Sequence, residues 1–211
     1  MTYKLICFDM SGVLFRDVNF WMELHKRFGT FEQGKILTDK LLHTDYTQLV
    51  QRVVAELWKG RNALPYFELV DSMQYIPGVE ETLKYARQKG YATAIISCSS
   101  MGAARRVQKD HGIDFIFANE LVIRDNVVSG EFLWPVGAGG PAKADIMQSL
   151  SRILGVNIED TVFVGDNKSD IDALRIAGRG IVFNPQADEL KEVEGACIVE
   201  SQTLADVVGY I

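Results

Sequence analysis

The sequence predicts an α/β fold in which a parallel sheet is covered by crossover helices and interrupted by one helical insertion. Short β-rich runs alternate with helical patterns along most of the chain, and this alternation is typical of βαβ units. The interval from residue 15 to residue 76 breaks the alternation, because it has helical periodicity and no convincing strand. A parallel sheet and an inserted helical segment account for both patterns.

The sheet is predicted from short runs rich in apolar residues. They are LICF (5–8), YATAIIS (91–97), DFIFA (114–118), TVFVG (161–165) and GIVF (180–183). Residues 79–90 and 143–155 are predicted crossover helices, since each ends in a glycine, which is a helix C-terminal signal. Residues 120–132 alternate around Asp125-Asn126 and predict a small β-hairpin.

The insertion contains one clear amphipathic helix. Its apolar residues recur at spacings of three and four: Tyr46, Leu49, Val50, Val53, Val54, Leu57 and Trp58. The segment begins just after the first strand and ends before Pro77-Gly78, so it is placed to cover that strand's carboxyl end. We therefore predict a core made of residues 1–14 and 77–211, and a helical cap made of residues 15–76.

Composition and net charge limit the kinds of molecule that the protein is expected to bind. The chain has 211 residues, 47% hydrophobic and 24% charged, as in an ordinary globular protein. Its formal charge of −6, without a run of Lys or Arg, offers no footprint for nucleic acid or an anionic membrane. With no signal-peptide layout and no long apolar span, we expect a cytoplasmic protein with small-molecule partners. The oligomeric state stays open.

Cysteine and histidine give little sign of chemistry. The three cysteines are far apart and lack metal-binding spacing, so neither a disulfide framework nor a zinc site is expected. His25, His43 and His111 stand in charged helical contexts, which favours surface positions and no role as a catalytic base.

Polar residues gather at the predicted strand ends. Asp9 follows the first strand, Ser97 ends the second, and Asp166 and Asp170 follow TVFVG. The carboxyl ends of parallel strands form one crevice, and a carboxylate cluster there suits Mg²⁺. Any one of these residues could simply cap a helix. Four together, with Lys143 opening a crossover helix, point to a binding site.

The order of these residues resembles the haloacid dehalogenase superfamily of phosphotransferases, over nearly the whole chain. DMSGV with Asp9 is similar to its nucleophile motif, AIISCSS with Ser97 to its second and GPAKADIM with Lys143 to its third. VGDNKSD, with Asp166 and Asp170, resembles the acidic fourth. Segments such as FANELVIRDNVVSGEF resemble the phosphoserine phosphatases within it. The resemblance implies a Rossmann-like core with a helical cap inserted after the first motif.

The resemblance also implies a mechanism. The carboxylate of Asp9 would attack phosphorus and form an aspartyl-phosphate. Mg²⁺ would be held by Asp9, the backbone carbonyl of Ser11 and Asp166, with Asp170 behind them. Ser97 and Lys143 would bind the equatorial phosphoryl oxygens, where charge gathers in the transition state.

Ser11 departs from the family pattern. Similar phosphatases carry a second aspartate there, which protonates the leaving oxygen and then deprotonates the attacking water. A hydroxyl does neither efficiently at neutral pH, and such acid–base catalysis contributes about 10² to 10⁴-fold. P-type ATPases, in the same superfamily, carry threonine at this place and keep their aspartyl-phosphate for a conformational cycle. The sequence therefore predicts slow release of the phosphoryl group.

Other departures concern the substrate. Cys98 and Ser99 replace a pair of glycines and would narrow the substrate pocket. Val18 falls where the family has an acidic residue that holds the serine ammonium, and Asp17 is one residue early. Arg52 either matches the arginine that grips the substrate carboxylate or is an ordinary exposed helix arginine. These departures weigh against serine specificity.

The leading hypothesis is thus a Mg²⁺-dependent phosphomonoester hydrolase with slowed or altered turnover. The alternatives are a pseudo-phosphatase that senses a phosphorylated metabolite and a phosphotransferase that passes the group to a second acceptor. The intact Asp9, Lys143, Asp166 and Asp170 argue against complete loss of chemistry. The sequence does not identify the physiological substrate.

Overall fold

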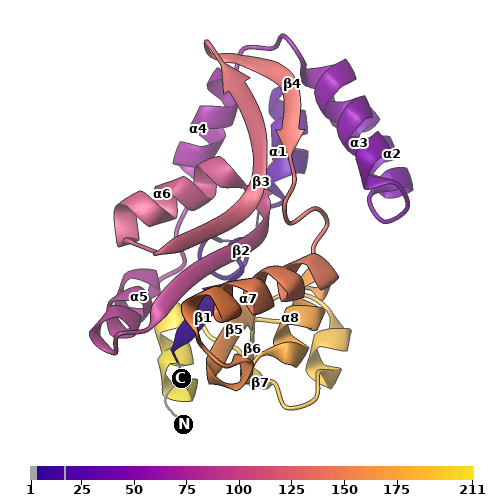
Figure 1. The fold of residues 1–211 in the computed structure, drawn as a ribbon. Coiled ribbons are helices and arrows are strands. Elements are labelled where there is room, and N and C mark those ends of the chain that lie inside the picture. Colours follow the sequence, from indigo (N-terminus) through magenta and orange to yellow (C-terminus); the bar gives the residue numbers. More distant parts are fainter. Residues whose placement is uncertain (1–3, 17) are drawn as a thin grey trace.

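A computed structural model describes residues 4–16 and 18–211 and contains a seven-stranded sheet (Figure 1). The strand order is β4-β3-β2-β1-β5-β6-β7, and every pair is parallel except β3 with β4. The strands are β1 Leu5–Phe8, β2 Ala92–Ser100, β3 Phe115–Arg124, β4 Val127–Leu133, β5 Thr161–Gly165, β6 Arg179–Phe183 and β7 Cys197–Val199. The predicted α/β class is confirmed.

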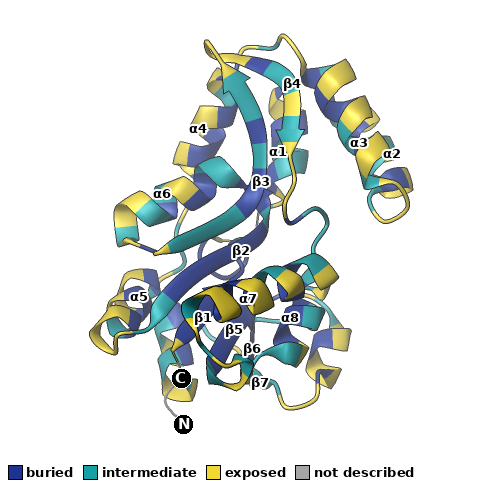
Figure 2. Cartoon of the chain, in the orientation of Figure 1, coloured by how far each residue is buried: buried dark blue, intermediate teal, exposed yellow. Residues whose placement is uncertain are grey.

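Strand β1 lies at the centre of the parallel part of the sheet. Leu5 pairs with Ala92 of β2 on one side and with Thr161 of β5 on the other. All four residues of β1 are buried, with Ile6 and Phe8 in one apolar cluster and Leu5 and Cys7 in another (Figure 2). An uninterrupted apolar run is what a strand covered on both faces requires.

Helices cover the two faces of the sheet. Helix α5 (Val79–Gln88), helix α6 (Met101–His111) and the 3₁₀ segment Leu204–Tyr210 pack with the cluster of Ile6 and Phe8. Helices α7 (Pro141–Leu154) and α8 (Ile171–Ile176) pack with the other cluster. Three short 3₁₀ segments complete this part, at Ile158–Asp160, Lys168–Asp170 and Asp188–Glu192.

The insertion between β1 and β2 is helical. It contains α1 (Phe20–Arg27), α2 (Phe31–Leu41), α3 (Tyr46–Val50), the π-helical segment η1 (Gln51–Trp58) that continues α3, and α4 (Leu64–Ser72). Residues 18–76 contribute no strand to the sheet. Their separation as a cap domain stays a prediction.

The hairpin joins the sheet to the insertion. DFIFA and the first hairpin arm, predicted as two pieces, form the single strand β3, because its lower half pairs with β2 and its upper half with β4. Asp125 and Asn126 make the turn with φ of 51° and 60°. The backbone N–H of Gly60 donates to the Val128 carbonyl at 2.9 Å, which ties β4 to the insertion. Figure 1 shows this arm rising beside α1.

Two further observations complete the fold. Strand β7 has only three residues and was not predicted from the sequence. Among the described residues, no helix combines the length and the apolar character that crossing a membrane would take.

Candidate active site

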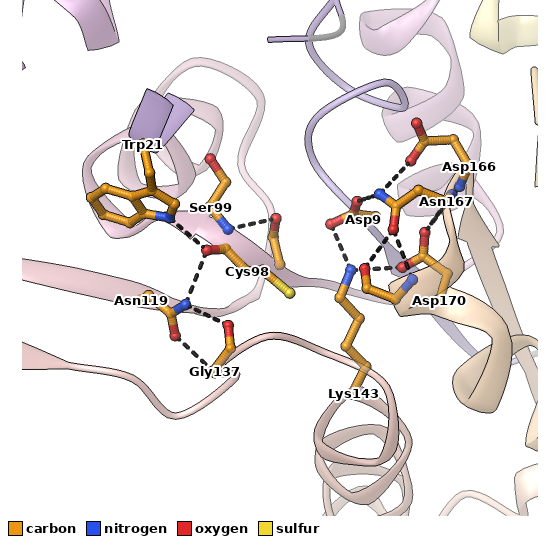
Figure 3. Close-up of polar contacts among 12 residues, drawn as sticks. Asp9, Trp21, Cys98, Ser99, Asn119, Gly137, Lys143, Asp166, Asn167 and Asp170 are labelled. Atoms are coloured by element: carbon orange, nitrogen blue, oxygen red, sulfur yellow. Dashed lines mark hydrogen bonds and ion pairs between the residues drawn. The ribbon is translucent and has the colours of Figure 1, made fainter. Parts of the chain in front are cut away.

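Three carboxylates meet where β1 and β5 end (Figure 3). Asp9 directly follows β1, and Asp166 directly follows β5. One oxygen from each of Asp9, Asp166 and Asp170 lies within 4.8 Å of the others, and all three residues are buried. The side chains that the sequence predicted to gather at the strand ends thus lie close together in the structure.

Gly12 allows the turn after β1 to approach Asp166. Its φ is +81°, and a Cβ atom at this position would stand 2.0 Å from Asp166 Oδ2. Any side chain here would displace the carboxylate and strain the backbone. The glycine in DMSGV is therefore required by the site itself.

Lys143 supplies a positive charge between two of the carboxylates. It sits in the first turn of α7 and is fully buried. Its Nζ lies 3.0 Å from Asp9 Oδ1 and 2.6 Å from Asp170 Oδ1. Burial alone would lower the pKa of Lys143, but the charges of Asp170 and Asp9 outweigh it and raise the pKa, so the ammonium stays charged.

Asp170 holds the neighbouring groups in place. Its Oδ2 accepts the backbone N–H groups of Asp166 at 3.0 Å and Asn167 at 3.1 Å, while Oδ1 accepts from Lys143. Burial raises the pKa of Asp170 to about 6, although the Lys143 charge opposes this. With both oxygens engaged, Asp170 is built to orient the site.

The donor set fits a divalent cation. Carboxylates are hard oxygen ligands, and three of them converge on one point with a single buried lysine beside them. The Ser11 hydroxyl next to Asp9 is buried and has no hydrogen-bond partner among the described residues. Asn167 Nδ2 lies 3.3 Å from Asp166 Oδ1. The cluster could therefore hold a metal ion.

A cavity of about 350 Å³ opens above this cluster. We call Asp9, Lys143, Asp166 and Asp170 the floor; Asp9 and Lys143 line the cavity, together with Ser11, Ser97, Cys98, Ser99, Asn167 and Ser169. The opposite wall comes from the insertion. We call its lining residues the roof: Val18, Asn19, Phe20, Trp21, Met22, His25, Thr38, Leu42, Tyr46, Leu49, Val50, Val53, Val54 and Trp58.

Cys98 and Ser99 lie between floor and roof. Both line the cavity, as the substrate-binding prediction requires, and the Ser99 hydroxyl has no hydrogen-bond partner in the described part of the chain. Burial raises the pKa of the Cys98 thiol to about 11, which keeps it protonated at neutral pH. The backbone N–H of Ser99 donates to Ser97 Oγ at 3.2 Å, so that the Ser97 hydroxyl hydrogen remains available.

Two residues that the sequence did not single out fix this strand end. The fully buried Asn119 of β3 donates from Nδ2 to the carbonyls of Cys98 at 3.0 Å and Gly137 at 2.8 Å. Trp21 Nε1 donates to the same Cys98 carbonyl at 2.9 Å. Figure 3 shows both side chains meeting at this carbonyl. Nothing in their local sequence distinguishes them.

The expectation of a surface His25 is wrong. His25 is 2% exposed, and its Nδ1 lies 2.8 Å from the Thr30 hydroxyl. Its ring packs against Trp58, with centroids 4.5 Å apart. The prediction was misled by the charged neighbours Lys26 and Arg27. These two residues are exposed on the polar face of the helix, whereas His25 lies on the buried face.

Arg52 is a predicted substrate-binding residue that the structure does not bring to the cavity. Its side chain is 51% exposed and pairs with Glu56 at 2.8 Å, one helical turn away. Val50, Val53 and Val54 on the same helix line the cavity in its place. Val18 also lines the cavity, whereas Asp17 lies outside the described residues.

Comparison with known proteins identifies the family of this chain. Residues 3–178 match the haloacid dehalogenase-like hydrolase family. The chain is 30% identical over 213 residues to a phosphoserine phosphatase of Methanocaldococcus jannaschii, covering 99% of this chain and 97% of the relative. It is also 30% identical to the phosphoserine phosphatase SerB2 of Mycobacterium tuberculosis, covering 93% of this chain but 48% of that protein.

Solved structures give the same result. A structure described as a phospho-aspartyl intermediate analogue of phosphoserine phosphatase aligns over 100% of both chains, with a TM-score of 0.83 and 29% identity. A substrate-bound phosphoserine phosphatase complex aligns with a TM-score of 0.83 and 26% identity, covering 100% of this chain and 99% of the other. The chain therefore belongs to the haloacid dehalogenase-like hydrolases, as a phosphatase-type member similar to phosphoserine phosphatases.

Proposed function

We propose that the chain is a Mg²⁺-dependent phosphomonoester hydrolase that works through an aspartyl-phosphate on Asp9, with turnover slowed by Ser11. One observation carries this proposal. The Asp9 carboxylate is buried at a strand end, lies 3.0 Å from the Lys143 ammonium and borders a cavity of about 350 Å³. The similarity to a structure described as a phospho-aspartyl intermediate analogue supports an aspartate as the nucleophile.

The metal would be held by Asp9 and Asp166, together with the backbone carbonyl of Ser11. When bound, Mg²⁺ supplies the positive charge that lets an anionic carboxylate approach an anionic phosphate. Asp170 would act from behind, since its two oxygens already accept hydrogen bonds from Lys143 and from backbone N–H groups.

The first step is attack by Asp9 on phosphorus. A bond forms between the carboxylate oxygen and phosphorus, the ester bond breaks, and the alcohol leaves with its bonding electrons. Lys143 and the Ser97 hydroxyl would bind the equatorial oxygens. In its hydrogen bond with the Ser99 N–H, the Ser97 hydroxyl acts as the acceptor, so its own hydrogen can be donated to the phosphoryl group. The leaving oxygen takes its proton from solvent, since Ser11 is too weak an acid.

In the second step water attacks phosphorus of the aspartyl-phosphate, the bond between phosphorus and the Asp9 carboxylate oxygen breaks, and inorganic phosphate leaves while the water gives up its proton to solvent. Ser11 is a poor base for this water, and the lost acid–base contribution of about 10² to 10⁴-fold corresponds to about 3 to 5.5 kcal/mol of barrier. With an aryl phosphate, whose leaving group needs little protonation, formation of the intermediate should outpace its hydrolysis. The intermediate should therefore accumulate as an initial burst.

Intact-protein mass spectrometry tests the proposal. The protein is incubated with an aryl phosphate and Mg²⁺, and a phosphoryl adduct is expected that Asp9→Asn cannot form. An adduct on Asp9→Asn would place the nucleophile elsewhere. If the parent forms no adduct although it binds Mg²⁺, a sensing pseudo-phosphatase becomes the better interpretation. Loss of the adduct only when an acceptor alcohol is added would favour a phosphotransferase.

A further inference from the structure

The roof is a largely apolar surface that faces the cavity instead of packing fully against other side chains. Tyr46, Leu49, Val50, Val53, Val54 and Trp58, six of the seven residues in the amphipathic stripe of α3 and η1, line the cavity. The stripe is thus the wall of a space of about 350 Å³, within the range of about 300 to 1,000 Å³ for small-molecule sites. Trp21, Met22 and Leu42 extend this wall.

The roof carries no Asp, Glu, Lys or Arg within residues 18–58, all of which the structure describes. Arg52 pairs with Glu56 on the outer side of its helix. A neighbouring hollow between α1 and α2 is lined by charged side chains. There Lys26 pairs with Glu23 at 3.0 Å and Lys35 pairs with Asp39 at 2.7 Å. These charges neutralise one another at the surface.

The few polar groups of the roof are already engaged or uncharged. Burial lowers the pKa of His25 to about 4, so the imidazole is neutral at pH 7, and its Nδ1 is hydrogen-bonded to the Thr30 hydroxyl. The Tyr46 hydroxyl lies 3.3 Å from Asn119 Nδ2. Asn19 caps α1 by accepting the Met22 N–H. Neither a substrate ammonium nor a substrate carboxylate would meet an opposite charge here.

The floor, by contrast, fixes where the phosphoryl group must sit. A phosphomonoester bound with its phosphorus beside Asp9 and Lys143 has to direct its alcohol part towards the roof, across Cys98 and Ser99. The aromatic rings along this path enclose it: Trp21 stacks against Trp58 at 6.4 Å and meets Phe132 edge-on at 5.2 Å.

We infer that the substrate is a phosphomonoester whose alcohol part is an uncharged and largely apolar group. This inference rests on the proposed phosphatase function. An apolar body gains from burial against the roof in proportion to its area. A zwitterionic body such as that of phosphoserine would have two charges removed from water without partners, which opposes binding.

The first test compares two primary alkyl esters, 2-phenylethyl phosphate and O-phosphoserine. Both need leaving-group protonation, so the defect at Ser11 affects both. We expect kcat/KM to favour the phenyl ester at least about a hundredfold. O-phosphoethanolamine and phosphoglycolate, which each carry one of the two charges, should both fall below the phenyl ester. Equal or better turnover of phosphoserine overturns the inference, and would indicate a charged partner that is not among the roof residues.

The second test measures binding without turnover. Calorimetry with 2-phenylethylphosphonate and with the phosphonate analogue of phosphoserine, on the parent protein with Mg²⁺, should show tighter binding of the phenyl compound. If the chain hydrolyses no ester but keeps this preference, the phosphatase proposal fails and the inference about the ligand stands. If esters are hydrolysed while the phosphoserine analogue binds more tightly, the inference alone fails.

Variants connect the preference to the roof. Val50→Asp places a carboxylate on the wall and should weaken binding of the phenyl phosphonate about tenfold or more. Val50→Thr keeps the shape, is safer for folding and should act in the same direction. Ile36→Asp is the matched control, since Ile36 is 67% exposed on α2 and should leave binding unchanged. Unaltered binding in both Val50 variants would overturn the inference.

Discussion

The floor of the cavity holds four charged side chains, whereas the roof holds none within residues 18–58. On the floor, Lys143 pairs at short range with two of the three carboxylates, those of Asp9 and Asp170. On the roof, aromatic and aliphatic side chains shape a space without specifying a polar contact. The difference separates two tasks. Under the proposed function, chemistry would depend on a few charged groups that cannot be exchanged, and substrate choice would depend on an apolar surface that can.

The two regions also differ in how they are attached. Asp9 and Asp166 follow the adjacent strands β1 and β5, Asp170 ends the 3₁₀ segment Lys168–Asp170, and Lys143 lies in the first turn of α7. The roof belongs to helices joined to that sheet by the β3–β4 arm and by the Trp21 hydrogen bond to Cys98. Substitutions on the floor should therefore affect stability and catalysis together, while roof substitutions should affect ligand preference.

The largest effect is expected for Lys143→Met. Removing this buried cation leaves Asp9 and Asp170 without compensation, which should lower the free energy of unfolding by about 3 to 5 kcal/mol. Urea denaturation in the presence of a chelator would measure the loss. Lys168→Met is the control, because Lys168 pairs with Glu189 on the surface and its removal should cost little. Equal losses in the two variants would show that the floor does not depend on paired charge.

His25 tests the roof by pH. Its folded pKa of about 4 lies below the unfolded value of about 6.5, so the unfolded state binds the proton more readily. The stability from neutral His25 is complete above about pH 6.5 and is lost as the pH falls, by about 3 kcal/mol near pH 4. His25→Gln should remove this pH dependence, while the exposed His43→Gln should retain it. A parent curve identical to that of His25→Gln would contradict the buried neutral imidazole.

Ser11→Asp changes a residue that lines the cavity beside the floor and leaves the roof untouched. Restoring a carboxylate returns an acid for the leaving group and a base for water, and steady-state turnover should rise about a hundredfold. The gain should be larger for an alkyl than for an aryl phosphate. Adding Asp9→Asn should abolish it, because no base can replace the nucleophile. Unchanged turnover with intact Mg²⁺ binding would mean that Ser11 is not the limiting defect.

The smallest effect is expected for Arg52→Ala. Because Arg52 is half-exposed and paired with Glu56, KM for carboxylate-bearing and carboxylate-free esters should change by less than about twofold. Initial-rate kinetics with phosphoglycolate and phenyl phosphate measure this. A selective rise in KM for phosphoglycolate would return Arg52 to the pocket and would break the contrast between a charged floor and an uncharged roof.

The sequence predicted the floor better than the roof, for a physical reason. Asp9 and Asp166 directly follow buried apolar strands, and parallel strands bring such positions together without further information. Lys143 has a similar local signal, since it opens a crossover helix after a glycine-rich stretch. The residues of the floor could be found because their placement follows from strand order.

The roof depends on tertiary packing that local patterns do not encode. Spacings of three and four correctly predicted the helix that carries Val50 and Val53, but burial against a cavity and burial against protein give the same pattern. His25 was misplaced because its neighbours are charged. Asn119 was overlooked because its importance arises only where β3 passes the ends of β2 and the Gly137 loop.

The central position of β1 has a consequence for synthesis of the chain. Asp9 comes within 3.5 Å of Asn167, a residue 158 positions later, and β1 cannot complete its pairing until β5, Thr161–Gly165, has emerged. Contacts of such large sequence separation slow folding, and a strand with an unpaired edge invites association with other chains. A nascent chain that stops before β5 therefore leaves one edge of LICF unpaired and carries Asp9 without Asp166. Synthesis must pass residue 170 before Asp9 acquires both of its carboxylate neighbours, so products that stop before β5 should be inactive and prone to aggregate.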